Sequence, residues 1–136
     1  NIHLNDLDET RHHCVEARVA NQLRDFQKAS RQFDLVILDP PKFAESKNQV
    51  MKASRAYKDL ALHAVGLLPP GGLLVTFSCS GAIAPALFQK ITADAFLDAG
   101  RGGEILHFLH QAPDHPVALA FPESQYLKGL VCRVID

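Results

Sequence analysis

The sequence predicts an α/β fold, a doubly wound sheet whose C-terminal pair of strands is antiparallel. Short apolar runs of strand length alternate with segments of helical apolar spacing, which is typical of strands joined by helices. The last strand-like segment follows its predecessor without a helix between them, and such strands usually pair antiparallel. With 136 residues, 47% of them hydrophobic and 21% charged, the chain is expected to form one domain over residues 1–136.

The N-terminal part contains two weakly patterned segments and one strong one. Residues 14–19 alternate in polarity and predict a strand, and residues 21–30 are expected to form a short helix. Residues 33–38 form a nearly continuous apolar run, typical of a central parallel strand buried on both faces. This strand is expected to end at Asp39, because the two prolines that follow cannot donate hydrogen bonds to a neighbouring strand.

A loop, a helix and a second buried strand are expected in the middle of the chain. Residues 42–52 are polar and predict a loop, and Ser54 is expected to cap the helix after it. The sequence Leu-Pro-Pro-Gly-Gly at 68–72 ends that helix. Residues 73–77 predict a second buried strand, which runs into Ser-Cys-Ser-Gly at 78–81.

The C-terminal part predicts one more helix and the final pair of strands. Residues 85–99 place their apolar side chains on one stripe, with a proline in the first turn and a glycine just beyond the end. Residues 104–109 and 126–134 predict strands, and the proline-containing residues 111–125 predict the loop between them.

Bulk properties narrow the classes of function. A net charge of -1 provides no general attraction to nucleic acid, so attraction to phosphates would need a local basic patch or a separate module. The three cysteines lack a Cys-x-x-Cys pair and the histidines lack ligand spacing, so no metal site and no disulfide framework are expected. No apolar run approaches the roughly 20 residues of a membrane span, so we expect a cytoplasmic protein. Because residue 1 is not methionine, the chain is expected to be part of a longer one.

Reactive side chains follow two predicted strands, at the edge where open α/β sheets bind ligands. Asp39, held by two prolines, could accept a hydrogen bond from the amine of a base, or could simply cap the loop. Cys79 could act as a nucleophile, since a thiolate is reactive, or could be an ordinary buried cysteine. Lys42 could contact a phosphate or a base oxygen, or could be a solvated loop residue. Four more basic residues around the same loop could contact an RNA backbone, or could form a solvated face: Lys47, Lys52, Arg55 and Lys58.

Four motifs resemble one family of enzymes. They are Phe-Asp-Leu-Val-Ile-Leu-Asp-Pro-Pro-Lys-Phe at 33–43, Tyr-Lys-Asp-Leu at 57–60, Gly-Gly-Leu-Leu-Val-Thr-Phe-Ser-Cys-Ser-Gly at 71–81, and Asp-His-Pro with Tyr-Leu-Lys-Gly near the end. Together they resemble the large-subunit ribosomal RNA methyltransferase I family of cytosine-5 enzymes, over essentially the whole chain. The resemblance implies a partial class I (Rossmann-like) methyltransferase sheet that lacks its first strands. It also implies S-adenosylmethionine as cofactor and 23S ribosomal RNA as partner.

The resemblance also implies roles for individual residues. Cytosine C5 is a poor nucleophile, and addition of a thiolate at C6 makes it reactive enough to take a methyl group. Cys79 would be that thiolate, and Asp39 would act beside the target base. The implied substrate-binding residues are Pro40, Pro41, Lys42 and Phe43, and the implied cofactor-binding residues are Asp39, Glu16 and Ala17.

Departures from the family pattern lead to two further expectations. The glycine-rich loop and the acidic residue that hold the cofactor in the family are not in this sequence, and Arg18 stands where the family tends to have an acidic residue. A guanidinium cannot accept a hydrogen bond from adenine, so this chain by itself is expected to be inactive. Without the first strands, residues 35–38 should form an exposed edge, and we expect a homodimer joined along it.

Two other functions remain open at this point. A related Asp-Pro-Pro methyltransferase could act on a purine nitrogen, a reaction that needs no covalent intermediate. Alternatively, the chain could be a non-catalytic remnant that dimerises or contacts RNA. Replacement of Cys79 by alanine separates the first of these from the cytosine reaction, since only the latter requires the thiol.

Overall fold

The structure, a computed structural model that describes residues 1–136, is built on a mixed sheet of four strands. The strands lie side by side in the order β1-β2-β4-β3. Strand β1 is parallel to β2, and β4 is antiparallel to both of its neighbours. The predicted α/β fold with an antiparallel C-terminal strand is therefore confirmed. The strands are β1 (Leu35–Leu38), β2 (Leu73–Ser78), β3 (Gly103–Leu109) and β4 (Lys128–Val134).

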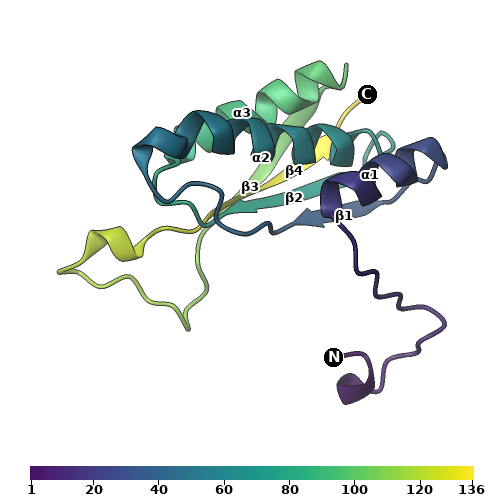
Figure 1. Cartoon of the computed structure of the whole chain (residues 1–136), viewed down its shortest axis with the longest axis horizontal. Helices are drawn as coiled ribbons and strands as arrows, with labels where there is room; N and C mark the ends of the chain where they lie inside the picture. Colours follow the sequence, from purple (N-terminus) through teal and green to yellow (C-terminus); the bar gives the residue numbers. More distant parts are fainter.

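Three helices cover one face of this sheet (Figure 1). They are α1 (Val19–Lys28), α2 (Val50–Val65) and α3 (Pro85–Asp98). No helix has the length and apolar character that crossing a bilayer would require. Along β2 burial alternates from one residue to the next, as it does in a strand with only one covered face.

The prediction that the first strand is buried on both faces is wrong. Leu35 and Ile37 in β1 are 48% and 59% exposed, because no helix of the chain lies on their side of the sheet. The uncovered side is termed the bare face, and its apolar residues on β1, β2 and β4 are Leu35, Ile37, Leu73, Val75, Phe77 and Val131. Strand β1 also lies at the end of the sheet, as expected, and pairs only with β2.

The core lies between the helices and the covered face. Helix α2 crosses its centre and contacts both other helices. Its buried residues Ala53, Tyr57, Leu60 and Ala64 recur every three or four positions, so they form a single face. Burying a large apolar side chain stabilises a protein by about 1.5–3 kcal/mol. This packing therefore holds the strand ends, and the residues that follow them, in place.

The predicted strand at residues 14–19 does not form. This segment has no regular structure and is exposed, and α1 begins at Val19. A strand needs a neighbour to share backbone hydrogen bonds with, and the segment has no such neighbour in this sheet. The alternation of apolar and polar residues was therefore not sufficient to form a strand.

The start of the second helix also differs from the prediction. A 3₁₀ turn at Lys47–Gln49 leads directly into α2 at Val50, so the loop is shorter than expected. Ser54 lies inside the helix, where its hydroxyl donates to the Val50 carbonyl oxygen at 2.8 Å instead of capping the first turn. The remaining helices and strands begin and end within two residues of their predicted bounds.

Two segments project from the body of the molecule (Figure 1). One is the chain before α1. The other is the connection between β3 and β4, which includes a short 3₁₀ turn at Pro122–Ser124. In this connection the side chains of Leu119 and Phe121 are 103% and 59% exposed.

Candidate active site

Asp39 and Cys79 lie at the same edge of the sheet. Each residue directly follows the last residue of its strand, and β1 and β2 are parallel neighbours in which Leu38 pairs with Thr76. Asp39 is exposed and Cys79 is half-buried, so a ligand at this edge could reach both. The structure therefore brings together the two residues expected to be catalytic, at the edge where ligands of open α/β sheets bind.

The turn that carries Cys79 is held by two buried serines. Ser78 and Ser80 are fully buried on either side of it. The backbone N–H of Ser80 donates to Ser78 Oγ at 3.3 Å. Ser80 Oγ in turn accepts from the Ala44 backbone N–H at 3.1 Å and shares a hydrogen bond of 2.9 Å with Tyr57 Oη. Cys79 is thus presented by a turn tied to α2 and to the loop after Asp39.

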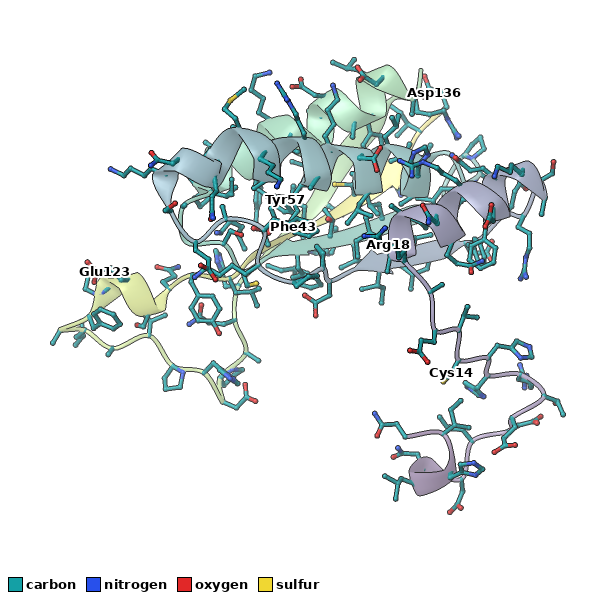
Figure 2. All side chains as sticks on the ribbon, viewed as in Figure 1. Cys14, Arg18, Phe43, Tyr57, Glu123 and Asp136 are labelled. Atoms are coloured by element: carbon teal, nitrogen blue, oxygen red, sulfur yellow. The ribbon has the colours of Figure 1, made fainter.

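Phe43 anchors the loop that follows Asp39. Its ring packs on Tyr57 with 4.8 Å between centroids, and Tyr57 contacts Phe88 edge-on at 5.6 Å. Figure 2 shows Phe43 and Tyr57 close together beneath α2. Lys42, the residue before Phe43, is exposed and free to contact a ligand. Among the predicted substrate-binding residues, Phe43 is therefore positioned as a support for the loop, whereas Lys42 faces solvent.

Lys128 was not identified as a site residue from the sequence. It is only 8% exposed, and its Nζ donates to the carbonyl oxygens of Ser80 at 2.7 Å and Ile83 at 2.8 Å. Burial lowers the pKa of Lys128, and the charge of the nearby Cys79 partly opposes this effect. The only sequence signal was a lysine immediately before the apolar run at residues 129–132.

Asp39 also lines a groove of about 820 Å³ between the start of α1, the end of β1 and α2. Apolar side chains form much of its surface, and Arg18 stands at the first turn of α1 (Figure 2). Besides Asp39, its lining includes Arg18, Val19, Ala20, Leu38, Pro40 and Leu60.

Glu16 and Ala17, which the resemblance implies as cofactor contacts, do not line this groove. Both are exposed in the segment before α1. Among residues 16–18, only Arg18 lines the groove. The role of Glu16 and Ala17 remains a prediction.

The other two cysteines lie elsewhere. Cys14 is exposed on the projecting N-terminal segment (Figure 2), and Cys132 is buried in β4, where burial raises the pKa of its thiol to about 11. Cys79 is therefore the one cysteine placed at the ligand-binding edge.

No group of three or more His, Cys, Asp or Glu side chains is arranged to hold a metal ion.

Sequence comparison connects this arrangement to known proteins. No protein-family model matches the chain. Proteins named ribosomal RNA large subunit methyltransferase I match nearly all of it. The one from Aeromonas hydrophila is 53% identical over 133 residues, and the one from Pseudoalteromonas atlantica is 49% identical over 135 residues. The chain is homologous to the C-terminal part of the ribosomal RNA large subunit methyltransferase I family. These matches cover 98–99% of the chain but only 34% of each relative, so the chain spans about a third of their length.

Solved structures agree on the fold. SMU.776, crystallised in complex with SAH, superposes with a TM-score of 0.81 at 24% identity, over 98% of this chain and 34% of the other. TrmN from Thermus thermophilus superposes with a TM-score of 0.55 at 18% identity, over 89% of this chain and 28% of the other. At these identities the likeness establishes the fold alone, a partial Rossmann-like sheet.

Proposed function

We propose that this chain is the substrate-binding part of an S-adenosylmethionine-dependent methyltransferase that modifies cytosine C5 in 23S ribosomal RNA. The observation that carries the proposal is the half-buried Cys79, presented on an anchored turn beside Asp39 at the ligand-binding edge. The names of the methyltransferase I relatives support ribosomal RNA as the substrate. With that substrate, we propose a cytoplasmic location.

In this proposal the chain's own residues perform the covalent steps. The Cys79 thiolate adds to C6 of the target cytosine, which makes C5 electron-rich and able to form a bond to carbon. After C5 has been methylated, it loses its proton to a base and Cys79 leaves as a thiolate, which restores the aromatic ring. Asp39 accepts a hydrogen bond from the exocyclic amine, and Lys42 binds a base oxygen or a phosphate.

The groove beside Asp39 fits one part of the cofactor. S-adenosylmethionine, when bound, supplies the methyl group as a carbon attached to a positively charged sulfur. The apolar side chains of Val19, Ala20 and Leu38 suit a flat purine ring. Arg18 can stack on that ring but cannot accept a hydrogen bond from its amine. The residues present therefore fit the adenine end, and we propose that other parts of the cofactor are held by residues outside this chain.

Basic residues near the site support contact with RNA. Lys47, Lys52 and Arg55 are exposed around the loop and the first turns of α2. Lys58 from the same predicted group pairs with Asp98 at 2.7 Å, so its charge is largely compensated. Exposed lysines and arginines of this kind bind phosphates and position a nucleic acid without reading its sequence.

The test is methylation by the whole methyltransferase that contains this chain. Replacement of Cys79 by alanine should reduce methyl transfer to 23S ribosomal RNA by at least about a thousandfold, as loss of an essential nucleophile does. A matched Cys14→Ala variant should retain full activity, because Cys14 is exposed on the N-terminal segment. Full activity of Cys79→Ala would refute the covalent mechanism and favour methylation of a purine nitrogen.

A trapping experiment identifies the covalent bond directly. RNA that carries 5-fluorocytosine at the target position cannot lose a proton from C5, so the adduct with the protein should accumulate. Mass spectrometry should then find the RNA attached to the peptide that contains Cys79. An adduct on another residue, or none in an active enzyme, would contradict the assignment.

We also propose that the isolated chain dimerises. Strand β1 ends the sheet with unpaired backbone groups, and its side chains Leu35 and Ile37 are exposed on the bare face. Exposed apolar edge strands commonly pair with a second chain. We propose that the second chain is another copy of this one, paired along β1.

A further inference from the structure

Lys128 is a buried cation without an anionic side chain bound to it. It is 8% exposed, and none of the ion pairs in the structure involves it. Both of its hydrogen bonds go to neutral carbonyl oxygens. A buried charge without a partner of opposite charge is costly, so its position calls for a compensating role.

The two acceptors of Lys128 lie on the turn that presents Cys79. One is the carbonyl oxygen of Ser80, the next residue along the chain, and the other is that of Ile83. Lys128 itself is the first residue of β4 and pairs across the sheet with Ser78, the residue before Cys79. The ammonium group therefore ties Ser80 to Ile83 on the turn, close enough to Cys79 for the two charges to interact.

We infer that Lys128 is a positioning residue for Cys79: it fixes the 78–83 turn through two carbonyl oxygens and places a positive charge beside the thiolate. This inference rests on the proposed role of Cys79 as nucleophile. A positive charge beside Cys79 stabilises the thiolate, which is the reactive form of the nucleophile. It also stabilises the thiolate that leaves when the C6 adduct breaks down. In the whole enzyme Lys128 thus acts through Cys79 and does not contact the RNA.

The test compares an anionic and a neutral alkylating reagent on the 136-residue chain. Rates of modification of Cys79 by iodoacetate and by iodoacetamide are measured peptide by peptide. Their ratio is divided by the same ratio at the exposed Cys14 in the same sample. A nearby positive charge attracts iodoacetate only, whereas a looser turn changes both rates alike.

Lys128→Met should lower this normalised ratio about three- to tenfold, the effect of removing one charge several ångströms away in a medium between protein and water. Lys128→Arg keeps the charge and should stay within about twofold of the unaltered chain. Lys90→Met serves as the matched control, because Lys90 lies on α3 and pairs with Asp94 at the surface; it should leave the ratio unchanged. An unchanged ratio in a folded Lys128→Met variant would overturn the inference.

A second measurement covers the case in which Lys128→Met does not fold. In the unaltered chain the normalised ratio should fall as sodium chloride is raised, because salt screens the charge beside Cys79. Lys128→Gln, which retains a hydrogen-bond donor but no charge, should remove most of that salt dependence. A ratio that does not respond to salt would refute the inference without any variant.

Methylation by the whole enzyme separates this inference from the proposed function. Lys128→Met should lower kcat at least about tenfold, with KM for RNA within about twofold, because a residue that acts only in the chemical step changes kcat. If Cys79→Ala is inactive but Lys128→Met changes neither kcat nor the alkylation ratio, only the role of Lys128 fails. If Cys79→Ala is fully active, the proposed function fails, whatever Lys128 does to alkylation.

Discussion

The three free cysteines of the chain occupy three different environments. Cys14 is exposed on a projecting segment, Cys79 is half-buried at a strand end, and Cys132 is buried in the centre of β4. The residue type is the same in each case, so reactivity is decided by burial and by neighbouring charges. Only Cys79 combines access for a ligand with a cation nearby.

Cys132 should resist alkylation in the folded chain. A rise of its pKa from 9.0 to about 11 lowers the thiolate fraction at pH 8 about a hundredfold, and burial slows reagent access further. Mass spectrometry after iodoacetamide treatment at pH 8 should find Cys14 modified while Cys132 is not. Equal modification of the two would show that β4 is not buried as described.

The pH dependence of stability should reveal the buried charge of Lys128. Its pKa is lowered below the ordinary 10.5 in the folded state, so between the two values the unfolded chain binds more protons. The contribution of Lys128 to the free energy of unfolding must therefore rise with pH across that interval. Urea unfolding of the unaltered chain and of Lys128→Met, compared from pH 7 to pH 10, should show the difference shifting in favour of the unaltered chain. A difference that is constant with pH would contradict the lowered pKa.

At the scale of elements, α1 is attached to the rest of the molecule mainly through α2. Arg24 donates to both carboxylate oxygens of Asp59, at 3.0 and 2.9 Å, and to Nε2 of His63 at 3.0 Å. Leu23 is the only residue of α1 that is buried. Because Asp59 and the first turn of α1 both line the groove beside Asp39, this contact between helices also shapes the proposed cofactor site.

Arg24→Ala should weaken the attachment of α1. Loss of a bidentate, half-exposed ion pair costs about 1 kcal/mol in the free energy of unfolding, and amide hydrogens of α1 should exchange faster. Lys28→Ala is the control, because Lys28 pairs only with Asp25 three residues earlier at the exposed surface, a contact worth less than about 0.5 kcal/mol. Similar losses for both variants would mean that the contact with α2 does not hold α1.

At the scale of the whole molecule, the sheet is covered on one side only. The helices bury one face, whereas the bare face and the edge of β1 remain open. Apolar surface left in water costs about 25 cal/mol per Å² relative to burial. The exposed face therefore favours association of the isolated chain.

The isolated chain should have a dimeric mass in solution. Light scattering at micromolar concentration should give about twice the mass of 14.9 kDa. Ile37→Lys places a charge on the exposed edge strand and should shift the chain toward the monomer, whereas Leu97→Lys on the exposed surface of α3 should not. A monomeric mass for the unaltered chain would rule out the proposed dimer.

Cofactor binding should differ between the isolated chain and the whole methyltransferase. The chain contributes only the adenine end of the proposed site, so calorimetric titration with S-adenosylmethionine should give no saturable heat, even at protein concentrations that detect millimolar binding. The whole enzyme should bind it saturably. Clear binding by the isolated chain would instead mean that its own residues, or two copies of it, complete the site.

Local sequence patterns were sufficient to predict most helices and strands, and the positions of Asp39 and Cys79 at two neighbouring strand ends. Apolar periodicity and the prolines and glycines between segments are local signals, so they located β1, β2, α3 and the last two strands closely. Because parallel neighbours end at the same edge, the same signals were enough to place Asp39 and Cys79 together. The family resemblance then followed from the residues at those strand ends.

Whether a predicted segment has a neighbour to pair with, or a helix to cover it, can be seen only in the folded chain. Residues 14–19 carry a strand pattern but have no neighbouring strand, and the 33–38 run is apolar but open on one side because all three helices pack on the other. Lys128 is separated from Ser80 by 48 positions in the chain, and a β2–β4 pairing is needed to bring them into contact. Pairing and coverage depend on residues far apart in sequence, and for this reason no local pattern could reveal them.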